Sequence, residues 1–217
     1  MDDSLRLRAR TARAEITSGA LRGAALLDLL LSIPFLERDA WTQKLLGIED
    51  PPLDIPDLPR GSVPYLPSGV AEILAVVLDV PVRAEDEFVD LGSGLGTVVI
   101  LAHLLTGARA RGIEIQEPLV HSARARCAEL SLPRVSFVHA DASDTELDGS
   151  IFFLYAPFNG KMLTRALRRL EEVARRRHII VCAVGLEFRD VSWLVPRKSS
   201  HVSLMLYDSC ALRNPTP

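Results

Sequence analysis

The sequence predicts an α/β fold: a doubly wound, mostly parallel sheet with a C-terminal antiparallel hairpin, preceded by an N-terminal helical extension. From about residue 68 onward, short apolar runs alternate with segments of helical periodicity, a pattern typical of βαβ units. The first of these runs passes directly into the glycine-rich run 92–96, as at a nucleotide-binding strand-to-helix turn. Only residues 196–200 separate the last two runs, which is too short for a helical crossover and favours an antiparallel hairpin.

The first sixty residues are expected to form a helical extension and a connector. Apolar residues alternate with charges at roughly helical spacing over residues 4–31, which predicts one long or two short amphipathic helices. A further helix is expected over residues 36–46, because Gly47 is a residue type favoured just past a helix C-terminus. The prolines of residues 49–60 exclude a helix or a central strand, since proline lacks a backbone N–H donor. We therefore divide the chain into an extension, residues 1–60, and a main domain, residues 61–217.

Each element of the main domain follows from its periodicity and its flanking residues. Ser68 is a candidate cap for a helix over residues 70–78, since its hydroxyl can accept a hydrogen bond from an unpaired backbone N–H. Parallel strands are expected at residues 88–91, 110–115, 135–139, 151–155 and 178–184. Helices are expected between them, in right-handed crossovers, at residues 98–105, 117–130 and 162–176. The closing hairpin is expected at residues 191–195 and 201–207.

Length and composition narrow the class of protein. A chain of 217 residues suits one α/β domain with a modest extension. The formal net charge of −3 offers no excess of Lys and Arg to neutralise a phosphate backbone, which disfavours a nucleic-acid partner. The three cysteines are scattered and lack metal-ligand spacing, so we expect reduced thiols and no metal site.

The N-terminal sequence argues against a membrane or secreted protein. The apolar stretch at residues 21–35 contains Arg22 and Asp28 and is shorter than the roughly 20 apolar residues that a membrane-spanning helix needs. The chain begins Met1-Asp2-Asp3, unlike a secretory signal, which has a basic start followed by an apolar block. We expect a cytoplasmic protein without a membrane partner, either a monomer or a homodimer.

Polar residues follow the first three strands where a nucleotide cofactor would bind. The glycines of residues 92–96 let the backbone approach a ligand closely, and the next helix presents free N–H groups. Glu114 ends the second strand, where a carboxylate can accept both hydroxyls of a ribose. Asp141 follows the third strand, where it either accepts a hydrogen bond from an adenine amino group or caps a helix. A dinucleotide fingerprint would require glycine at position 97, which is Thr97.

These features together resemble the class I S-adenosylmethionine (SAM) dependent methyltransferases, which open the cofactor site with a D-x-G-x-G-x-G motif. The resemblance spans about residues 63–210 and includes the terminal hairpin. It implies SAM as the cofactor, with one acid on the ribose, another on the adenine, and Ile115 and Ala142 sandwiching the adenine. The cofactor-binding residues that it implies are Tyr65, Asp90, Gly92, Ser93, Gly94, Gly96, Glu114, Ile115, Asp141 and Ala142.

Two further segments are candidates for the chemistry around the methyl group. Residues 63–68 look like the segment that covers the methionine end of SAM in many family members, and Tyr65 either faces the sulfonium or packs as part of a loop. Family members that methylate amines carry [DN]-P-P-[YF] after the fourth strand, but this chain has Ala156 and Phe158 at two of those positions. That departure argues against amine methylation by that arrangement. The acceptor-pocket candidates are Tyr155, Pro157, Phe158 and Asn159.

The leading hypothesis is a SAM-dependent methyltransferase with a small-molecule acceptor. We assign no catalytic residue, because methyl transfer depends on in-line approach and exclusion of water more than on a strong acid or base. Two alternatives stay open: a protein methyltransferase of the lysine type, suggested by residues 65–68, and a SAM-binding protein without transfer activity, suggested by residues 156–158. The arginines of the helix at residues 162–176 fit a solvated polar face better than a binding surface for an anionic partner.

The apolar faces of the N-terminal helices must be buried somewhere, and the connector leads directly into the segment with Tyr65. We therefore expect the first sixty residues to fold over the C-terminal ends of the strands as a lid that excludes water. The alternative is that they cover a remote face of the domain or form a dimer contact.

Overall fold

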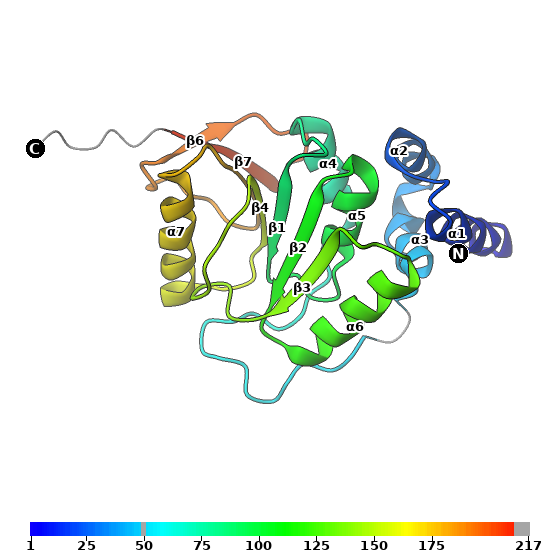
Figure 1. Cartoon of the computed structure of the whole chain (residues 1–217), viewed down its shortest axis with the longest axis horizontal. Coiled ribbons are helices and arrows are strands. Elements are labelled where there is room, and N and C mark those ends of the chain that lie inside the picture. Colours follow the sequence, from blue (N-terminus) through cyan, green and yellow to red (C-terminus); the bar gives the residue numbers. More distant parts are fainter. Residues whose placement is uncertain (49–50, 211–217) are drawn as a thin grey trace, which may run out of the picture.

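The computed structural model describes residues 1–48 and 51–210 and confirms the predicted fold class. Glu49 and Asp50, at the start of the predicted connector, and residues 211–217, at the end of the predicted main domain, lie outside the described residues. A seven-stranded sheet with the order β3-β2-β1-β4-β5-β7-β6 forms the centre (Figure 1). Its strands are β1 (Glu87–Leu91), β2 (Arg109–Glu114), β3 (Val135–His139), β4 (Ile151–Tyr155), β5 (Ile180–Val184), β6 (Leu194–Arg197) and β7 (Leu204–Ser209).

The strand order reverses between β1 and β4, and this reversal sets the position of the site. The chain moves outward from β1 through β2 to β3 and then returns to the other side of β1 with β4. These strands and β5 are all parallel, so their carboxyl ends meet at one edge of the sheet. Ligands of open α/β sheets bind in the crevice that such a reversal leaves at the carboxyl ends of the strands.

Alternating strand residues supply two apolar cores, one on each face of the sheet. In β1, Phe88 packs toward one core and Val89 toward the other, and both are fully buried. Phe88 stacks against Phe153 of β4 with 6.3 Å between the ring centroids. The helices α4 (Val70–Asp79), α5 (Thr97–Thr106) and α6 (Glu117–Glu129) cover the first face, and α7 (Gly160–Ala174) covers the second (Figure 1).

The predicted C-terminal hairpin is present, although both of its strands begin about three residues later than expected. β5 pairs with β7 in the antiparallel direction, and β7 pairs in the same way with β6 at the edge of the sheet. The first part of the predicted strand at residues 191–195 is a turn instead, closed by hydrogen bonds from Val191 N to Phe188 O and from Leu194 N to Val191 O. Apolar residues in a buried turn imitate the composition of a strand, so the shift could not be read from the pattern.

The N-terminal extension contains three helices: α1 (Asp3–Thr17), α2 (Gly23–Ser32) and α3 (Phe35–Leu46). α2 packs on α5, and α3 packs on α1, α2 and α4, so these helices lie beyond α5 and α4 as seen from the sheet (Figure 1). Their buried faces include Leu26, Leu30 and Trp41, and the indole N–H of Trp41 donates to the Leu5 carbonyl at 3.0 Å. The segment that runs along the carboxyl ends of the strands comprises the described part of the predicted connector, residues 51–60, and the residues that follow it, 61–68 (Figure 1). The prediction that the N-terminal helices form a lid over the strand ends is therefore wrong, because they pack on α4 and α5. Of the described residues before α4, only the segment at residues 51–68 lies where a lid would have to be.

The predicted cap at Ser68 is wrong. α4 begins at Val70, its N-cap residue is Gly69, and no side chain at that position caps it. The Val70 N–H instead donates to Oδ1 of Asp39, which lies on α3, at 2.8 Å. A carboxylate from a neighbouring helix satisfies the free N–H and lies favourably against the positive end of the α4 dipole. Within the described residues, no helix combines the length and the apolar character needed to cross a bilayer.

We predict that Asp39→Ala lowers the free energy of unfolding by about 1 kcal/mol or more, because it leaves the Val70 N–H without its acceptor. Asp39→Asn keeps an acceptor oxygen and should retain most of the stability. Ser68→Ala should change stability by less than about 0.5 kcal/mol. Urea unfolding of the three variants measures these differences, and an equal loss in Ser68→Ala and Asp39→Ala would contradict the assignment of the cap.

Candidate cofactor and acceptor site

A pocket of about 930 Å³, its open mouth included, lies at the carboxyl ends of β1, β2, β3 and β4. Its walls come from the glycine-rich loop after β1, the residues just past β2 and β3, the segment after β4, and residues 62–68, which precede α4. The predicted site residues that line it are Tyr65, Asp90, Gly92, Ser93, Gly94, Glu114, Ile115, Asp141, Ala142, Tyr155, Pro157 and Phe158.

Two predicted site residues, Gly96 and Asn159, are not among the pocket-lining residues. Gly96 is the N-cap residue of α5 with φ of 80°, and a Cβ there would lie 2.3 Å from Cζ of Phe137. It lets α5 pack closely against β3. Asn159 precedes α7, has an exposed side chain, and donates its backbone N–H to Gly61 O at 2.9 Å. Both residues therefore support neighbouring backbone in this structure.

The glycine-rich loop is held tightly against the end of β2. The N–H groups of Gly92 and Ser93 both donate to the Ile113 carbonyl, at 2.8 and 3.1 Å. Gly94 has φ of 52°, and a Cβ there would lie 2.4 Å from Cε2 of Tyr65. The backbone at Gly94 is thus pressed between the strand end and an aromatic ring, where only glycine fits.

Glu114 connects this loop with the turn that follows β2. Its Oε2 accepts the Gly94 N–H at 2.8 Å, and its Oε1 accepts the Gln116 N–H at 2.9 Å. Burial raises the pKa of Glu114 above its ordinary value, although the hydrogen bonds from Gln116 and Gly94 act in the opposite direction. A carboxylate has about four acceptor positions, so capacity remains for ligand hydroxyl groups.

A second acid, Asp90, lies buried at the end of β1 and is only 3% exposed. Burial first, and the charge of Glu114 second, raise the pKa of Asp90 well above its ordinary value. Two carboxyl groups in one buried region disfavour each other's ionisation, whereas a cationic ligand group favours it. The arrangement therefore suits a ligand with a positive charge near the glycine-rich loop.

Residues 51–68, which we call the strap, are hydrogen-bonded to the walls of the pocket at both ends. Gln116 is 2% exposed; its Oε1 accepts the Ile55 N–H at 2.9 Å and its Nε2 donates to Asp54 Oδ1 at 2.7 Å. The same oxygen of Asp54 accepts the Tyr65 N–H at 2.9 Å. At the other end, the Val63 N–H donates to Pro157 O at 3.0 Å. The strap thus bridges the turn after β2 and the segment after β4.

The segment after β4 has an unusual backbone at Ala156. Its φ of 41° is a left-handed conformation, which Asp and Asn adopt more readily than Ala does. Pro157 packs so closely on Gly92 that a Cβ at that glycine would lie 2.3 Å from Cβ of Pro157. Burial, and then the negative charges of Glu72 and Asp39, raise the pKa of Tyr155 above its ordinary value. Tyr155 therefore keeps its proton at neutral pH and can donate a hydrogen bond.

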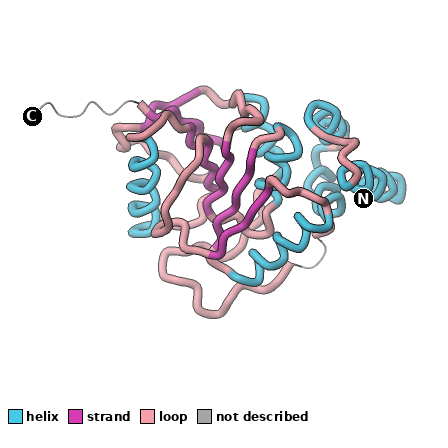
Figure 2. Tube along the Cα trace, viewed as in Figure 1, coloured by secondary structure: helices cyan, strands magenta, loops and turns pink. Residues whose placement is uncertain are grey.

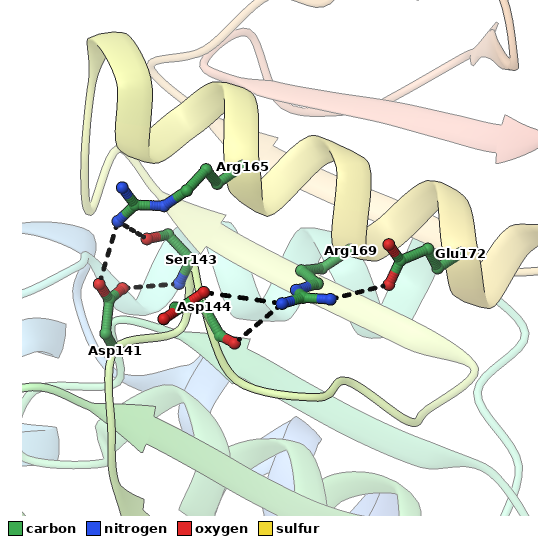
Figure 3. A network of polar contacts seen from close by, with 6 residues as sticks. All are labelled: Asp141, Ser143, Asp144, Arg165, Arg169 and Glu172. Carbon is green, nitrogen blue, oxygen red and sulfur yellow. Dashed lines mark hydrogen bonds and ion pairs between the residues drawn. The ribbon is translucent and has the colours of Figure 1, made fainter.

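Asp141 does not cap a helix, because the connection from β3 to β4 is loop throughout (Figure 2). Its Oδ1 accepts the Ser143 N–H at 2.8 Å, and its Oδ2 forms an ion pair with Nη2 of Arg165 at 3.2 Å (Figure 3). The same Nη2 donates to Oγ of Ser143 at 2.7 Å. The three side chains form a closed ring of contacts between α7 and the loop that lines the pocket.

Sequence patterns did not mark Gln116, Asp54 or Arg165 as site residues. Gln116 and Asp54 are 62 residues apart and meet only because the strap folds back along the ends of the strands. Arg165 lies on the polar face of α7, whose pattern predicts solvent exposure. An amide directly after a predicted strand was a signal for Gln116, but it does not name a partner.

Comparisons with known proteins show one family match and several similar folds. Residues 88–176 match the family model described as a methyltransferase domain. No curated protein matches the sequence. An RNA methyltransferase from Salinibacter ruber, solved with S-adenosyl-L-homocysteine (SAH), is 21% identical with a TM-score of 0.54, over 70% of this chain and 98% of that chain. The putative methyltransferase yhhF from Escherichia coli is 19% identical with a TM-score of 0.55, over 73% and 92% of the two chains.

The mitomycin 7-O-methyltransferase MmcR is a third similar structure, 13% identical with a TM-score of 0.51, over 64% of this chain and 52% of that chain. At these identities the similarity to solved structures concerns the fold, and the family model carries the assignment within residues 88–176. The glycine-rich loop, Glu114 and Asp141 all lie inside that range. Residues 88–176 therefore match a methyltransferase domain, and the chain shares its fold with solved structures described as methyltransferases.

Proposed function

We propose that this protein transfers a methyl group from SAM to a small-molecule acceptor. The observation that supports it is a single pocket that joins the ends of β1, β2 and β3 to the segment after β4. The first three strand ends supply the groups suited to SAM, and residues 155–158 supply a separate wall for the acceptor. A donor and an acceptor bound in one pocket meet the geometric requirement for direct transfer.

The proposed position of SAM follows from the polar groups of the pocket. The ribose hydroxyls donate to the free acceptor positions of Glu114, and the adenine ring lies between Ile115 and Ala142 with its amino group toward Asp141. The methionine end then reaches the glycine-rich loop, beneath the ring of Tyr65. There the sulfonium gains from the ring face and from the buried carboxyl group of Asp90.

The transfer step needs little acid or base catalysis. When bound, SAM would supply its methyl carbon to a nucleophilic atom of the acceptor in line with the sulfur; the new bond would form as the S–C bond breaks, SAH would leave as a neutral thioether, and a proton on the acceptor atom would pass to solvent. Among the pocket-lining residues 155–158, Tyr155, the last residue of β4, is the titratable one. With its raised pKa it orients the acceptor through a donated hydrogen bond. The strap contributes by excluding water from the pocket.

A small-molecule acceptor fits the surface better than RNA does. The arginines of α7 and the turn after it are largely engaged: Arg169 pairs with Asp144 and Glu172, and Arg175 pairs with Glu171. Paired guanidinium groups contribute little to phosphate binding. The protein-acceptor alternative draws some support from Leu66, which lines the pocket and is 63% exposed, as an apolar contact for a peptide. If the wild-type protein binds SAM but methylates no acceptor, the alternative of a SAM-binding protein without transfer activity would be favoured instead.

We predict that SAM and SAH bind and that NAD does not, because Glu114 and the spacing of the glycines suit SAM while Thr97 disrupts the dinucleotide fingerprint. Calorimetric titration with the three ligands measures this. Label from methyl-labelled SAM should then enter the small-molecule fraction of a cell extract and not its protein or RNA fractions. Binding of NAD alone would refute the proposed function. Methyl label in the protein fraction would show that the acceptor is a protein and not a small molecule.

We predict that Glu114→Ala weakens SAH binding by about 10- to 150-fold, the value of one or two hydrogen bonds to a charged acceptor. Gly94→Val should weaken it at least as much, because the new side chain meets Tyr65. Thermal unfolding of each variant controls for loss of the fold. Near-native affinity in both variants would remove these residues from the cofactor site.

Binding should also depend on pH in a defined direction. The ribose hydroxyls require ionised Glu114, whose pKa in the free protein is raised above 4.5, so SAH affinity should rise with pH through that raised value and binding should release protons. Glu114→Gln should show a shallower rise over the same pH range, because only Asp90 still contributes. Equal pH slopes in the two proteins would contradict ionisation of Glu114 on binding.

We predict that Gln116→Leu, which keeps the volume but removes both side-chain contacts to the strap, speeds SAH dissociation by about tenfold. Trypsin should also cleave faster after Arg60, an exposed residue of the strap. Gln43→Leu on α3, outside the pocket, is the matched control and should behave like the wild type. Unchanged dissociation in Gln116→Leu would exclude the strap as a lid.

A further inference from the structure

The ion pair between Arg165 and Asp141 links the helix on one face of the sheet to the pocket. Asp141 lines the pocket, whereas Arg165 lies on α7 and is not among the lining residues. The guanidinium group reaches the carboxylate through Nη2 alone, and the same nitrogen holds Oγ of Ser143 (Figure 3). Ser143 is fully buried, so one of the partners is fixed by packing.

This ring of contacts determines how the carboxylate of Asp141 is turned. Oδ1 is held by the Ser143 N–H and Oδ2 by Arg165, so rotation of the carboxylate would break a contact at each oxygen. Each oxygen has two acceptor positions, which leaves one on each for a ligand in the pocket. A carboxylate with a fixed orientation accepts a hydrogen bond from one placed donor better than a rotating one, because binding no longer costs its conformational entropy.

The contact has little value for stability, which makes a role in binding testable. The side chains of Arg165 and Asp141 are 46% and 29% exposed, and exposed ion pairs contribute little to folding. Arg169, one turn further along α7, provides a comparison. It forms similar exposed pairs with Asp144 and Glu172, neither of which lines the pocket (Figure 3).

We propose that Arg165 is a positioning residue for cofactor specificity, which orients Asp141 to accept a hydrogen bond from the 6-amino group of the adenine. The proposal rests on the proposed function, since it assumes that SAM binds in this pocket. Under this proposal α7 contributes to both halves of the site. It begins at Gly160, shortly after residues 155–158, and Arg165 in its second turn holds Asp141. The residue acts through Asp141 and needs no contact with the ligand.

The experiment compares SAH with its 6-deamino analogue, in which a hydrogen atom replaces the amino group of the purine. Calorimetry gives the ratio of the two affinities for the full-length wild type and for each variant. The wild type should prefer SAH by about tenfold or more, one hydrogen bond to a charged acceptor. Arg165→Ala should reduce this preference about three- to fivefold while binding the analogue almost as the wild type does.

Two further variants separate positioning from a general structural effect. Arg165→Lys keeps a cation that can reach one of the two partners, so its preference should lie between those of the wild type and Arg165→Ala. Arg169→Ala should keep the full preference for SAH. A merely structural role would weaken both ligands equally and leave the ratio unchanged, which a ratio measurement detects even if stability falls slightly.

The outcomes distinguish this inference from the proposed function. Failure of the wild type to bind SAH at all would overturn both. Binding of SAH without preference over the 6-deamino analogue, an unchanged or increased preference in Arg165→Ala, or an equal loss in Arg169→Ala would each overturn the role of Arg165 alone. A reduced preference confined to Arg165→Ala, with partial retention in Arg165→Lys, would support it.

Discussion

The buried carboxylate of Glu114 is the group on which the arrangement of the site depends. It ends β2 and accepts one N–H from the glycine-rich loop and another from Gln116. Through the side chain of Gln116 the same turn holds Asp54 and Ile55 of the strap. The glycine-rich loop and the strap are thus connected through Glu114 and Gln116 at the end of β2. A substitution of Glu114 is expected to alter the position of both.

The two halves of the pocket are also connected on the acceptor side. Pro157 packs on Gly92 and accepts the Val63 N–H, so the segment after β4 contacts both the glycine-rich loop and the strap. The left-handed Ala156 precedes it in a conformation that costs free energy for a residue with a Cβ. Backbone strain held between packed neighbours is common where a site is preorganised, and here the strained residue lies between Tyr155 and Phe158, which both line the pocket.

Sequence patterns anticipated the parts of this structure that are local or that parallel topology brings together. The apolar runs predicted the strands of the parallel sheet, and because carboxyl ends of parallel strands share one edge, Glu114 and Asp141 could be expected near the glycine-rich loop. Contacts between distant segments could not be predicted. The cap of α4 comes from Asp39, 31 residues away, although Ser68 stood at the usual place. The N-terminal helices pack on α4 and α5 because those helices have apolar outer faces, a property that becomes visible only once the sheet is assembled.

We infer that SAM binds in the pocket at the carboxyl ends of β1 to β3 with its ribose on Glu114. A crystal structure of the full-length protein with SAH bound would test this. We expect both ribose hydroxyls within about 3.2 Å of the Glu114 carboxylate and the adenine between Ile115 and Ala142. SAH bound elsewhere, or bound here with its ribose turned away from Glu114, would contradict it.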